Sequence, residues 1–161
     1  MTAILKHFLK IAEKYRDLRI TDPEPIGYID EQLKERSTIR AADVGCRAGR
    51  YDLKLLEHIG DKVSLYCVDS SEKMLEQLQA YLRRHGIQAF QAIEADARNL
   101  PINDTSLDCV FTFNAIHHFK AAQFLEEAFR VLRDDGHLFI YTRLRSQNIG
   151  SRNLPARLIS S

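Results

Sequence analysis

The sequence predicts one α/β domain with a mainly parallel, doubly wound β-sheet. Two observations carry this prediction: strand-like apolar runs alternate with amphipathic helical runs between residues 39 and 142, and polar residues follow four of these strands in succession. Strands separated by helices form right-handed crossover units, which lie parallel in one sheet. The length of 161 residues suits one domain and leaves little room for a second.

The alternating pattern defines five strands in the expected order 3-2-1-4-5. Their expected ranges are 39–44, 62–68, 88–93, 107–113 and 137–142. Helices are expected over 51–59, from the residue after an N-cap at Ser70 or Ser71 up to Gly86, and over 121–132. An Asp134-Asp135-Gly136 turn is expected before the fifth strand.

Two more helices are expected before the sheet, and we assign residues 1–38 to an N-terminal helical cover. Apolar residues recur at three- and four-residue steps from Ala3 to Tyr15, which is typical of an amphipathic helix. Prolines at 23 and 25 are expected to end that pattern, because proline disfavours helix at and before its own position. A short second helix is then expected over about residues 27–35.

Composition and charge exclude several classes of function. The net charge of +1 provides no long-range field for a polyanion or an anionic membrane, so a nucleic-acid role is not expected. No apolar run reaches the roughly 20 residues needed to span a bilayer, and we expect no membrane insertion. The three cysteines, Cys46, Cys67 and Cys109, have no metal-site spacing and are expected to be buried thiols. They favour a reducing compartment, and we predict a cytoplasmic protein without a metal site.

Polar residues stand at four strand ends in succession. Asp43, Asp69, Asp96 and Asn114 follow or end the first four strands. Ligands of doubly wound sheets bind beyond the carboxyl ends of the strands, where the strand order switches. The sequence therefore predicts a ligand site above this edge of the sheet.

Five segments in order carry a resemblance to a known family. They are DVGCRAGRY at 43–51, VDSSEKML at 68–75, EADARNLP at 94–101, FNAIHHF at 113–119 and VLRDDGHL at 131–138. Together they resemble the motifs of the class I S-adenosylmethionine (SAM)-dependent methyltransferases, most closely the quinone-biosynthesis branch. The resemblance covers residues 40–142 and implies a Rossmann-like sandwich, with residues 39–142 as its SAM-binding core. It also implies methyl transfer from SAM to a small-molecule acceptor, with S-adenosylhomocysteine (SAH) as the product.

The resemblance implies roles for ten residues in holding the cofactor. Gly45 and Gly49 let the backbone approach the methionine part, where a side chain would collide. An acid at Asp69 suits the two ribose hydroxyls, as in nucleotide-binding folds. By resemblance, Asp96 accepts from the adenine amino group, and Asn114 lies near the methyl-donating end. The remaining expected contacts are Asp43, Arg47, Ser70, Met74 and Ala97, the last two packing on the adenine ring.

Three of these assignments have structural alternatives. Asp43 and Asp69 could instead serve as helix caps or carry charges beside a helix. Met74 lies on the apolar face of its helix, where ordinary core packing explains it equally well.

Arg47 departs from the family pattern, which most often has glycine at this position. Three alternatives remain open: the guanidinium swings out to solvent, it pairs with the carboxylate of the cofactor, or it impairs the site. We hypothesise that Arg47 weakens cofactor binding without abolishing it.

His117 and His118 are the candidate catalytic residues. Methyl transfer depends mainly on holding the acceptor in line with the methyl group, so a base is needed only for a hydroxyl or carbon acid. Histidine has a suitable reference pKa of about 6.5. The alternative is that one histidine packs at the strand end and the other is solvated.

The last 19 residues, 143–161, form an expected irregular basic tail with four arginines and no carboxylate. Family members usually have two more strands, so strands 6 and 7 are expected to be missing and the fifth strand to form an open edge. Open edges pair readily with other chains. We expect either a homodimer through this edge or a tail that folds back across it; a truncated fragment of a longer protein is a further alternative.

Arg47 and the short C-terminus also favour a second function. In this alternative the domain binds SAM or SAH without turnover and has a regulatory or scaffolding role. A nicotinamide dehydrogenase is disfavoured, because its glycine fingerprint would need glycines in place of Arg47 and Arg50. The segment around Tyr15 and Arg19 resembles the cover that family members fold over the cofactor, and a surface helix packed elsewhere is equally compatible with it.

Overall fold

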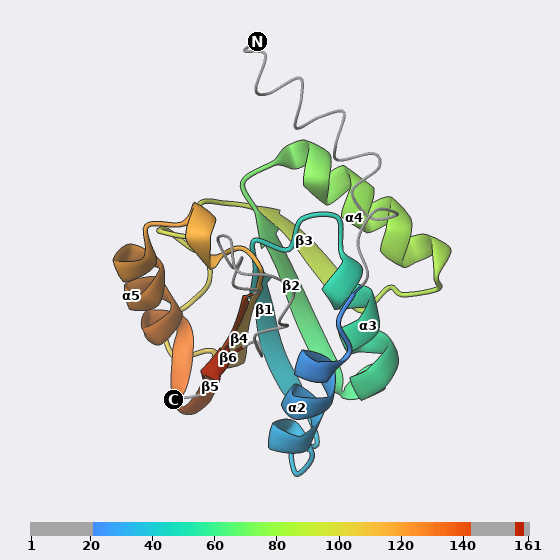
Figure 1. The fold of residues 1–161 in the computed structure, drawn as a ribbon, viewed down its shortest axis with the longest axis horizontal. Helices are drawn as coiled ribbons and strands as arrows, with labels where there is room; N and C mark the ends of the chain where they lie inside the picture. Colours follow the sequence, from blue (N-terminus) through green and yellow to red (C-terminus); the bar gives the residue numbers. More distant parts are fainter. Residues whose placement is uncertain (1–20, 143–156, 160–161) are drawn as a thin grey trace, which may run out of the picture.

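The computed structural model describes residues 21–142 and 157–159 (Figure 1). The expected helix at residues 3–15 and the cover residues Tyr15 and Arg19 lie outside these ranges. The centre is a six-stranded sheet in the order β3-β2-β1-β4-β5-β6. Strands β1 to β5 are parallel, and β6 runs antiparallel to β5. The predicted α/β fold and the order 3-2-1-4-5 are therefore confirmed.

The elements follow one another in the predicted alternation. The strands are β1 (Ile39–Val44), β2 (Val63–Asp69), β3 (Phe90–Glu94), β4 (Leu107–Phe113), β5 (Leu132–Thr142) and β6 (Arg157–Ile159). The α-helices are α2 (Glu24–Leu33), α3 (Arg50–Ile59), α4 (Glu72–Arg84) and α5 (Ala121–Val131). Two 3-10 helices complete the set, η1 (Gly60–Lys62) and η2 (Ile116–His118).

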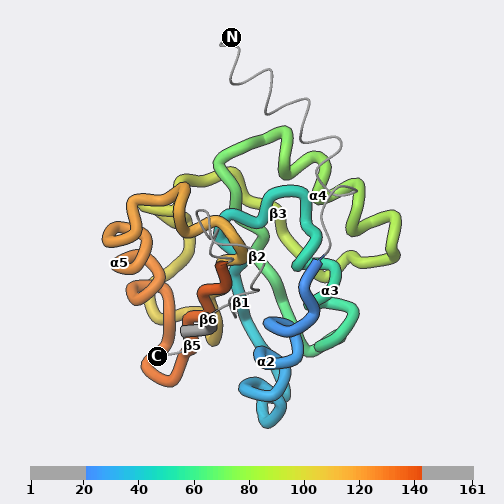
Figure 2. Tube along the Cα trace, in the orientation of Figure 1, coloured from blue at the N-terminus to red at the C-terminus, as the bar shows by residue number. Residues whose placement is uncertain are grey.

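The sheet has helices on both faces, as a doubly wound sheet requires. Helices α2, α3 and α4 bury their apolar faces against one side, and α5 covers the other (Figures 1 and 2). Neighbouring strand residues alternate between the two cores: Phe111 packs with α3 and α4, whereas Val110 packs with α5. Both faces of β4 are buried along its whole length, which explains its continuous apolar character.

The thiols of all three cysteines are free and buried, as expected. Among the described residues, no helix is long and apolar enough to cross a membrane. The same part of the chain holds no cluster of three or more histidine, cysteine or acidic residues that could bind a metal ion.

The second helix begins three residues earlier than predicted, at Glu24 instead of about Gly27. Pro23 is its N-cap residue and Pro25 lies in its first turn. Proline is tolerated there because the first N–H groups of a helix have no intrahelical partner. The two prolines therefore begin a helix, and the prediction that this segment only interrupts helical structure was wrong.

Strand β5 begins at Leu132, five residues before the predicted start, and includes the segment that we expected to be a turn. Its register with β4 shifts between the pairs Leu107–Leu132 and Cys109–His137, so the extra residues form a bulge. Asp108 lies at this bulge and is buried. Its carboxylate accepts hydrogen bonds from Arg133 Nη1 at 2.9 Å, Arg36 Nη1 at 3.1 Å and the backbone N–H of Arg40 at 2.7 Å.

The C-terminal tail is not entirely irregular, and the expectation that a sixth strand is missing was wrong. Strand β6 pairs antiparallel with the end of β5, through Ile140–Ile159, Tyr141–Leu158 and Thr142–Arg157. Of the two arrangements expected for the open edge, the structure shows the tail folding back across it. The apolar pair Leu158-Ile159 was the available sign of a strand, but two residues are too few for a periodic pattern.

Asp108→Ala is expected to lower the free energy of unfolding by about 2–4 kcal/mol, because the backbone N–H of Arg40, the partly buried guanidinium of Arg36 and the more exposed one of Arg133 lose this acceptor. Urea denaturation followed by circular dichroism measures the change. Asp135→Asn is the matched control: Asp135 also accepts from Arg36, but its side chain is 74% exposed, so a change below about 0.5 kcal/mol is expected. Equal losses in the two variants would contradict a role of Asp108 as the buried centre of this network.

Candidate functional site

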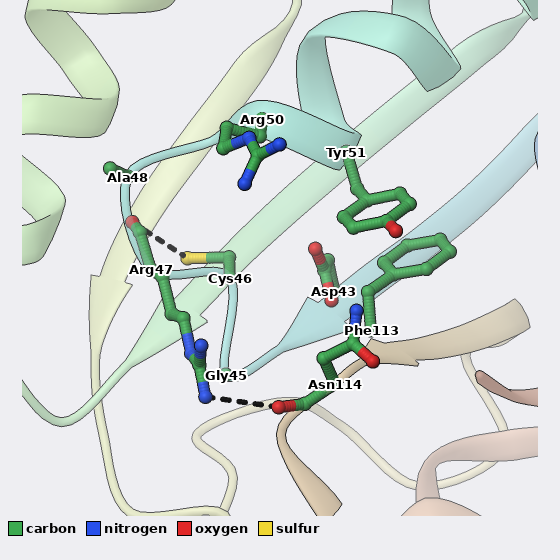
Figure 3. A pocket seen from close by; sticks show the side chains of 9 residues that line it. All are labelled: Asp43, Gly45, Cys46, Arg47, Ala48, Arg50, Tyr51, Phe113 and Asn114. Atoms are coloured by element: carbon green, nitrogen blue, oxygen red, sulfur yellow. Dashed lines mark hydrogen bonds between the residues drawn. The ribbon is translucent and has the colours of Figure 1, made fainter. Parts of the chain in front are cut away.

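The carboxyl edge of the sheet brings together three of the four predicted strand-end residues. Asp43 lies next to the end of β1, Asp69 ends β2 and Asn114 follows β4. Arg47 in the β1–α3 loop connects Asp69 to Asn114. Its backbone N–H donates to Asp69 Oδ2 at 2.9 Å, and its Nη2 donates to the carbonyl oxygen of Asn114 at 2.9 Å. Between these elements lies a pocket (Figure 3), lined by Asp43, Gly45, Cys46, Arg47, Ala48, Arg50, Tyr51, Phe113 and Asn114.

The β1–α3 loop is held by backbone contacts that need glycine. The N–H groups of Gly45 and Cys46 both donate to the carbonyl of Val68, at 2.8 and 3.0 Å. Gly45 has a φ of 78°, and a Cβ atom there would lie 2.7 Å from both Ala115 Cβ and Phe119 Cζ. A side chain at this position would therefore push the loop away from the segment after β4. The glycine therefore serves the protein's own packing, and its role toward a ligand stays a prediction.

Gly49 has a comparable constraint on the other side of the loop. Its φ is 84°, and a Cβ atom would lie 2.9 Å from Leu78 Cγ of α4. Gly49 is the N-cap residue of α3, so this close approach sets the start of α3 beside the pocket. The first N–H groups of a helix and its dipole favour negative charge at such a position.

Asp69 joins two loops through its carboxylate. Besides the bond from Arg47, its Oδ1 accepts from the backbone N–H of Ser71 at 2.9 Å. Burial raises the pKa of Asp69, and the hydrogen bonds from Ser71 and Arg47 partly oppose that shift. Ser71, and not Ser70, caps α4, with its Oγ accepting from Met74 N at 3.3 Å. Asp69 thus has a structural role beside the one predicted for it, and its oxygens retain lone pairs for a ligand.

The expected adenine contacts lie outside the pocket. Asp96 is exposed, and Arg98 binds its carboxylate through Nε at 2.9 Å and Nη2 at 2.6 Å. Hydrogen bonding from Arg98 lowers the pKa of Asp96 to about 2. Ser70, Met74 and Ala97 are also absent from the pocket wall. The roles of Asp96, Met74 and Ala97 in binding adenine, and of Ser70 in binding the cofactor, stay predictions.

Arg47 crosses the pocket, so of the three alternatives the structure does not show a guanidinium turned out to solvent. Its side chain extends from the β1–α3 loop toward Asn114 (Figure 3). Its φ of 53° is in the left-handed region, where a residue other than glycine is strained. Both observations fit a position that glycine would suit better.

His117 and His118 lie in η2, and both are exposed. Their ring centroids are 4.1 Å apart. Partial burial lowers the pKa of His118, the charges of His117 and Arg47 lower it further, and Asp69 opposes them. The pKa of His118 therefore lies below its ordinary value, which favours the neutral imidazole that a base requires.

An aromatic wall, which sequence analysis missed, closes one side of the pocket. Tyr51 of α3 stacks on Phe113 with ring centroids 4.4 Å apart and an interplanar angle of 2°. Tyr141 of β5 lies 6.0 Å from Tyr51 and donates its hydroxyl to Asp22. Tyr51 and Phe113 stand at the edges of two of the motifs, and this was the available sign of the wall. Their contact depends on the strand register, which the motifs do not give.

A pair of buried aspartates lies at the base of the pocket. Asp43 is 2% exposed and Asp52 of α3 is fully buried. Burial, the charge of Asp52 and a hydrogen bond with it raise the pKa of Asp43 well above its ordinary value. Burial raises the pKa of Asp52 to about 7, although hydrogen bonds from Cys67 and Asp43 lower it. Sequence analysis missed Asp52; its sign was an acid on the apolar stripe of α3, at positions 52, 55, 56 and 59.

Comparison with known proteins agrees with this geometry. Residues 42–140 match the family described as "Methyltransferase domain". The chain belongs to the class I SAM-dependent methyltransferases. The match does not single out the quinone-biosynthesis branch.

Named relatives of this methyltransferase domain come from bacteria. An uncharacterized methyltransferase of Mycobacterium bovis is 31% identical over 69% of this chain and 42% of its own length. A phthiotriol/phenolphthiotriol dimycocerosates methyltransferase of Mycobacterium ulcerans is 44% identical over 41% of this chain and 24% of its own length. The structure of a SAM-dependent methyltransferase from Aquifex aeolicus superposes with a TM-score of 0.63 at 24% identity, covering 81% of this chain and 79% of that one. The methyltransferase domain described here thus spans less than half the length of these two sequence relatives.

Asp52→Asn is expected to stabilise the protein at pH 8 by about 1–3 kcal/mol and to flatten the dependence of stability on pH. The folded-state pKa of Asp52, about 7, exceeds its ordinary 3.8, so the folded protein binds the proton more tightly than the unfolded chain. Stability should therefore fall as pH rises from about 4 through 7, and asparagine removes that loss. Thermal melts between pH 5 and pH 8 measure it; a variant that loses stability more steeply than the wild type would contradict the assignment.

Proposed function

We propose that this domain binds SAM at the carboxyl edge of its sheet and transfers the methyl group to a small-molecule acceptor. The observation that carries the proposal is the pocket lined by Asp43, Asn114 and the glycine-bearing β1–α3 loop, which Asp69 holds through the backbone N–H of Arg47. Membership of the methyltransferase family supports it.

The donors and acceptors of the pocket fit the groups of such a cofactor. The lone pairs left on Asp69 suit ribose hydroxyls, and the buried Asp43 Oδ1, which has no donor among the described residues, suits the ammonium group of an amino acid. The start of α3 beside the pocket suits a carboxylate. The cofactor supplies a methyl group on a sulfonium, which is already a good leaving group.

The protein contributes to methyl transfer mainly by positioning the acceptor. The stacked pair Tyr51–Phe113 forms a rigid apolar wall that can exclude water and orient an acceptor. His118, held neutral beside Arg47, can accept a proton from an acceptor hydroxyl; His117 is its direct neighbour. We place the protein in the cytoplasm on the strength of its free buried thiols.

The alternative function, SAM or SAH binding without turnover, has less support. The comparisons name methyltransferases, and His118 is an exposed histidine that could serve as a base. Arg47 remains the feature that favours the alternative, and its effect on affinity is measurable.

Asp69→Ala is expected to weaken binding of SAH by about 100-fold, because two hydrogen bonds to a charged acceptor are lost. Titration calorimetry measures the affinity, and a thermal melt checks that the variant is folded, since Asp69 also holds both loops. Asp61→Asn is the control: Asp61 is an exposed acid in η1, at the opposite end of β2, and its loss should leave affinity unchanged. Undiminished SAH binding by folded Asp69→Ala would contradict the proposed site.

Arg47→Gly is expected to bind SAH about 10-fold more tightly than the wild type. Glycine relieves the left-handed backbone and removes a guanidinium that a ligand must displace from the Asn114 carbonyl. Parallel calorimetric titrations of the two proteins measure the difference. Unchanged affinity would contradict the hypothesis that Arg47 weakens binding, and weaker binding would show that the guanidinium pairs with the ligand carboxylate.

A further inference from the structure

The aspartate pair beneath the pocket has more acceptor atoms than donors. Asp43 Oδ1 and Asp52 Oδ2 are buried and accept no hydrogen bond from the described residues. The other oxygen of Asp52, Oδ1, accepts from the thiol of Cys67 at 3.3 Å. Two ionised carboxylates cannot donate to each other, so a hydrogen bond between them requires a proton on one of them.

The groups that face the pair from the surrounding elements do not neutralise it. Asp69 and the thiol of Cys67 face it from β2, and the thiol of Cys46 and the guanidinium of Arg47 face it from the β1–α3 loop. The attraction of Arg47 for Asp43 is smaller than the effects of burial and of Asp52, and the charge of Asp69 acts in the opposite direction. Arg50 of α3 lines the same pocket, and its Nε donates to Thr21 Oγ1 at 3.1 Å.

A buried carboxyl pair of this kind titrates as one unit. Ionising both members places two negative charges close together in a buried site, so the pair retains one proton to a higher pH than an ordinary aspartate does. The raised pKa of Asp43 and the value of about 7 for Asp52 agree with this expectation.

We propose that Asp43 and Asp52 share one proton in the ligand-free protein and release it to solvent when the ammonium group of the ligand's amino-acid end binds Asp43. This inference rests on the proposed function and deepens it, because it names a regulator of the site, pH. The carboxyl O–H bond breaks, the proton leaves to buffer, and an ammonium N–H donates to the carboxylate in its place. The charge of the site is −1 before binding and −1 after it, since the ligand brings one positive charge and one proton leaves.

Proton release makes affinity depend on pH. A binding step that releases one proton gains about tenfold in affinity for each unit that pH rises below the pKa of the pair, and levels off above it. The affinity for SAH should therefore rise about tenfold between pH 5.5 and 6.5. 5′-Methylthioadenosine has the same nucleoside but no amino-acid end, so its affinity should not change over this range.

Titration calorimetry at pH 6.5 in phosphate and in a buffer with a large protonation enthalpy, such as imidazole, counts the protons released. We expect about one proton per SAH bound, none for 5′-methylthioadenosine, and a loss of the release in Asp52→Asn, whose amide can donate permanently to Asp43. Asp61→Asn, the exposed control, should release as many protons as the wild type. SAH binding with equal heats in both buffers would overturn the inference while leaving the proposed function intact.

A second measurement reads the shared proton without any ligand. Carbon-13 NMR of the aspartate carboxyl groups between pH 3 and pH 9 should show two carbons that titrate together, well above the range of exposed aspartates. In Asp52→Asn this shared step should be lost, because the amide donates to an ionised Asp43 and lowers its pKa. Absence of SAH binding would count against the proposed function and against proton release on binding. Titration of all carboxyl carbons near pH 4 would overturn the shared proton itself.

Discussion

The hydrogen bonds that Asp69 accepts hold the functional end of this molecule together. The sheet sets the distance between the ends of β1 and β2, but the loops beyond those ends could take many paths. One carboxylate fixes both loops, since one oxygen accepts from Arg47 in the β1–α3 loop and the other from Ser71 before α4. The placement of Arg47, the start of α3 and the pocket between β1 and β4 all depend on this connection. It also explains why a partly buried acid is tolerated at the strand end: backbone N–H groups supply part of the solvation that burial removes.

The charge distribution around the pocket also depends on how few partners its acidic groups have. Acids outnumber bases at its base, with Asp43, Asp52 and Asp69 near one another and Arg47 as the cation that acts on them. The guanidinium is directed to a carbonyl oxygen across the pocket, so it compensates this charge only in part. The base of the site carries negative charge that Arg47 does not fully compensate, and a helix begins at its side. Such a site is suited to the zwitterionic end of a ligand. The departure from glycine at position 47 alters this balance as well as the room available.

Much of the fold could be predicted because it depends on patterns between residues that are close in the sequence. The bounds of β1 and β4 follow from apolar runs, and the ends of α4 follow from a serine cap and a glycine in the left-handed region. What could not be predicted depends on contacts between distant segments. The early start of β5 is set by the bulge beside Asp108, whose partners come from residues 36, 40 and 133. In the site, Asp43, Gly45, Arg47 and Asn114 were found from motifs, whereas Asp52 and Tyr51 enter the pocket region only through the rotation of α3 against the sheet. Asp96 shows the limit of a motif: its carboxylate binds Arg98, two residues away, and does not line the pocket, so its role stays a prediction.

The antiparallel pairing of β6 with β5 has a consequence for how the chain is made. Residues 157–159 follow β5 by more than a dozen positions, so a growing chain completes five strands before the sixth can pair. Until those residues leave the ribosome, the backbone groups at the end of β5 lack this partner and can pair with another nascent chain. Pairing with β6 therefore covers backbone groups at the end of β5 that could otherwise pair with another chain.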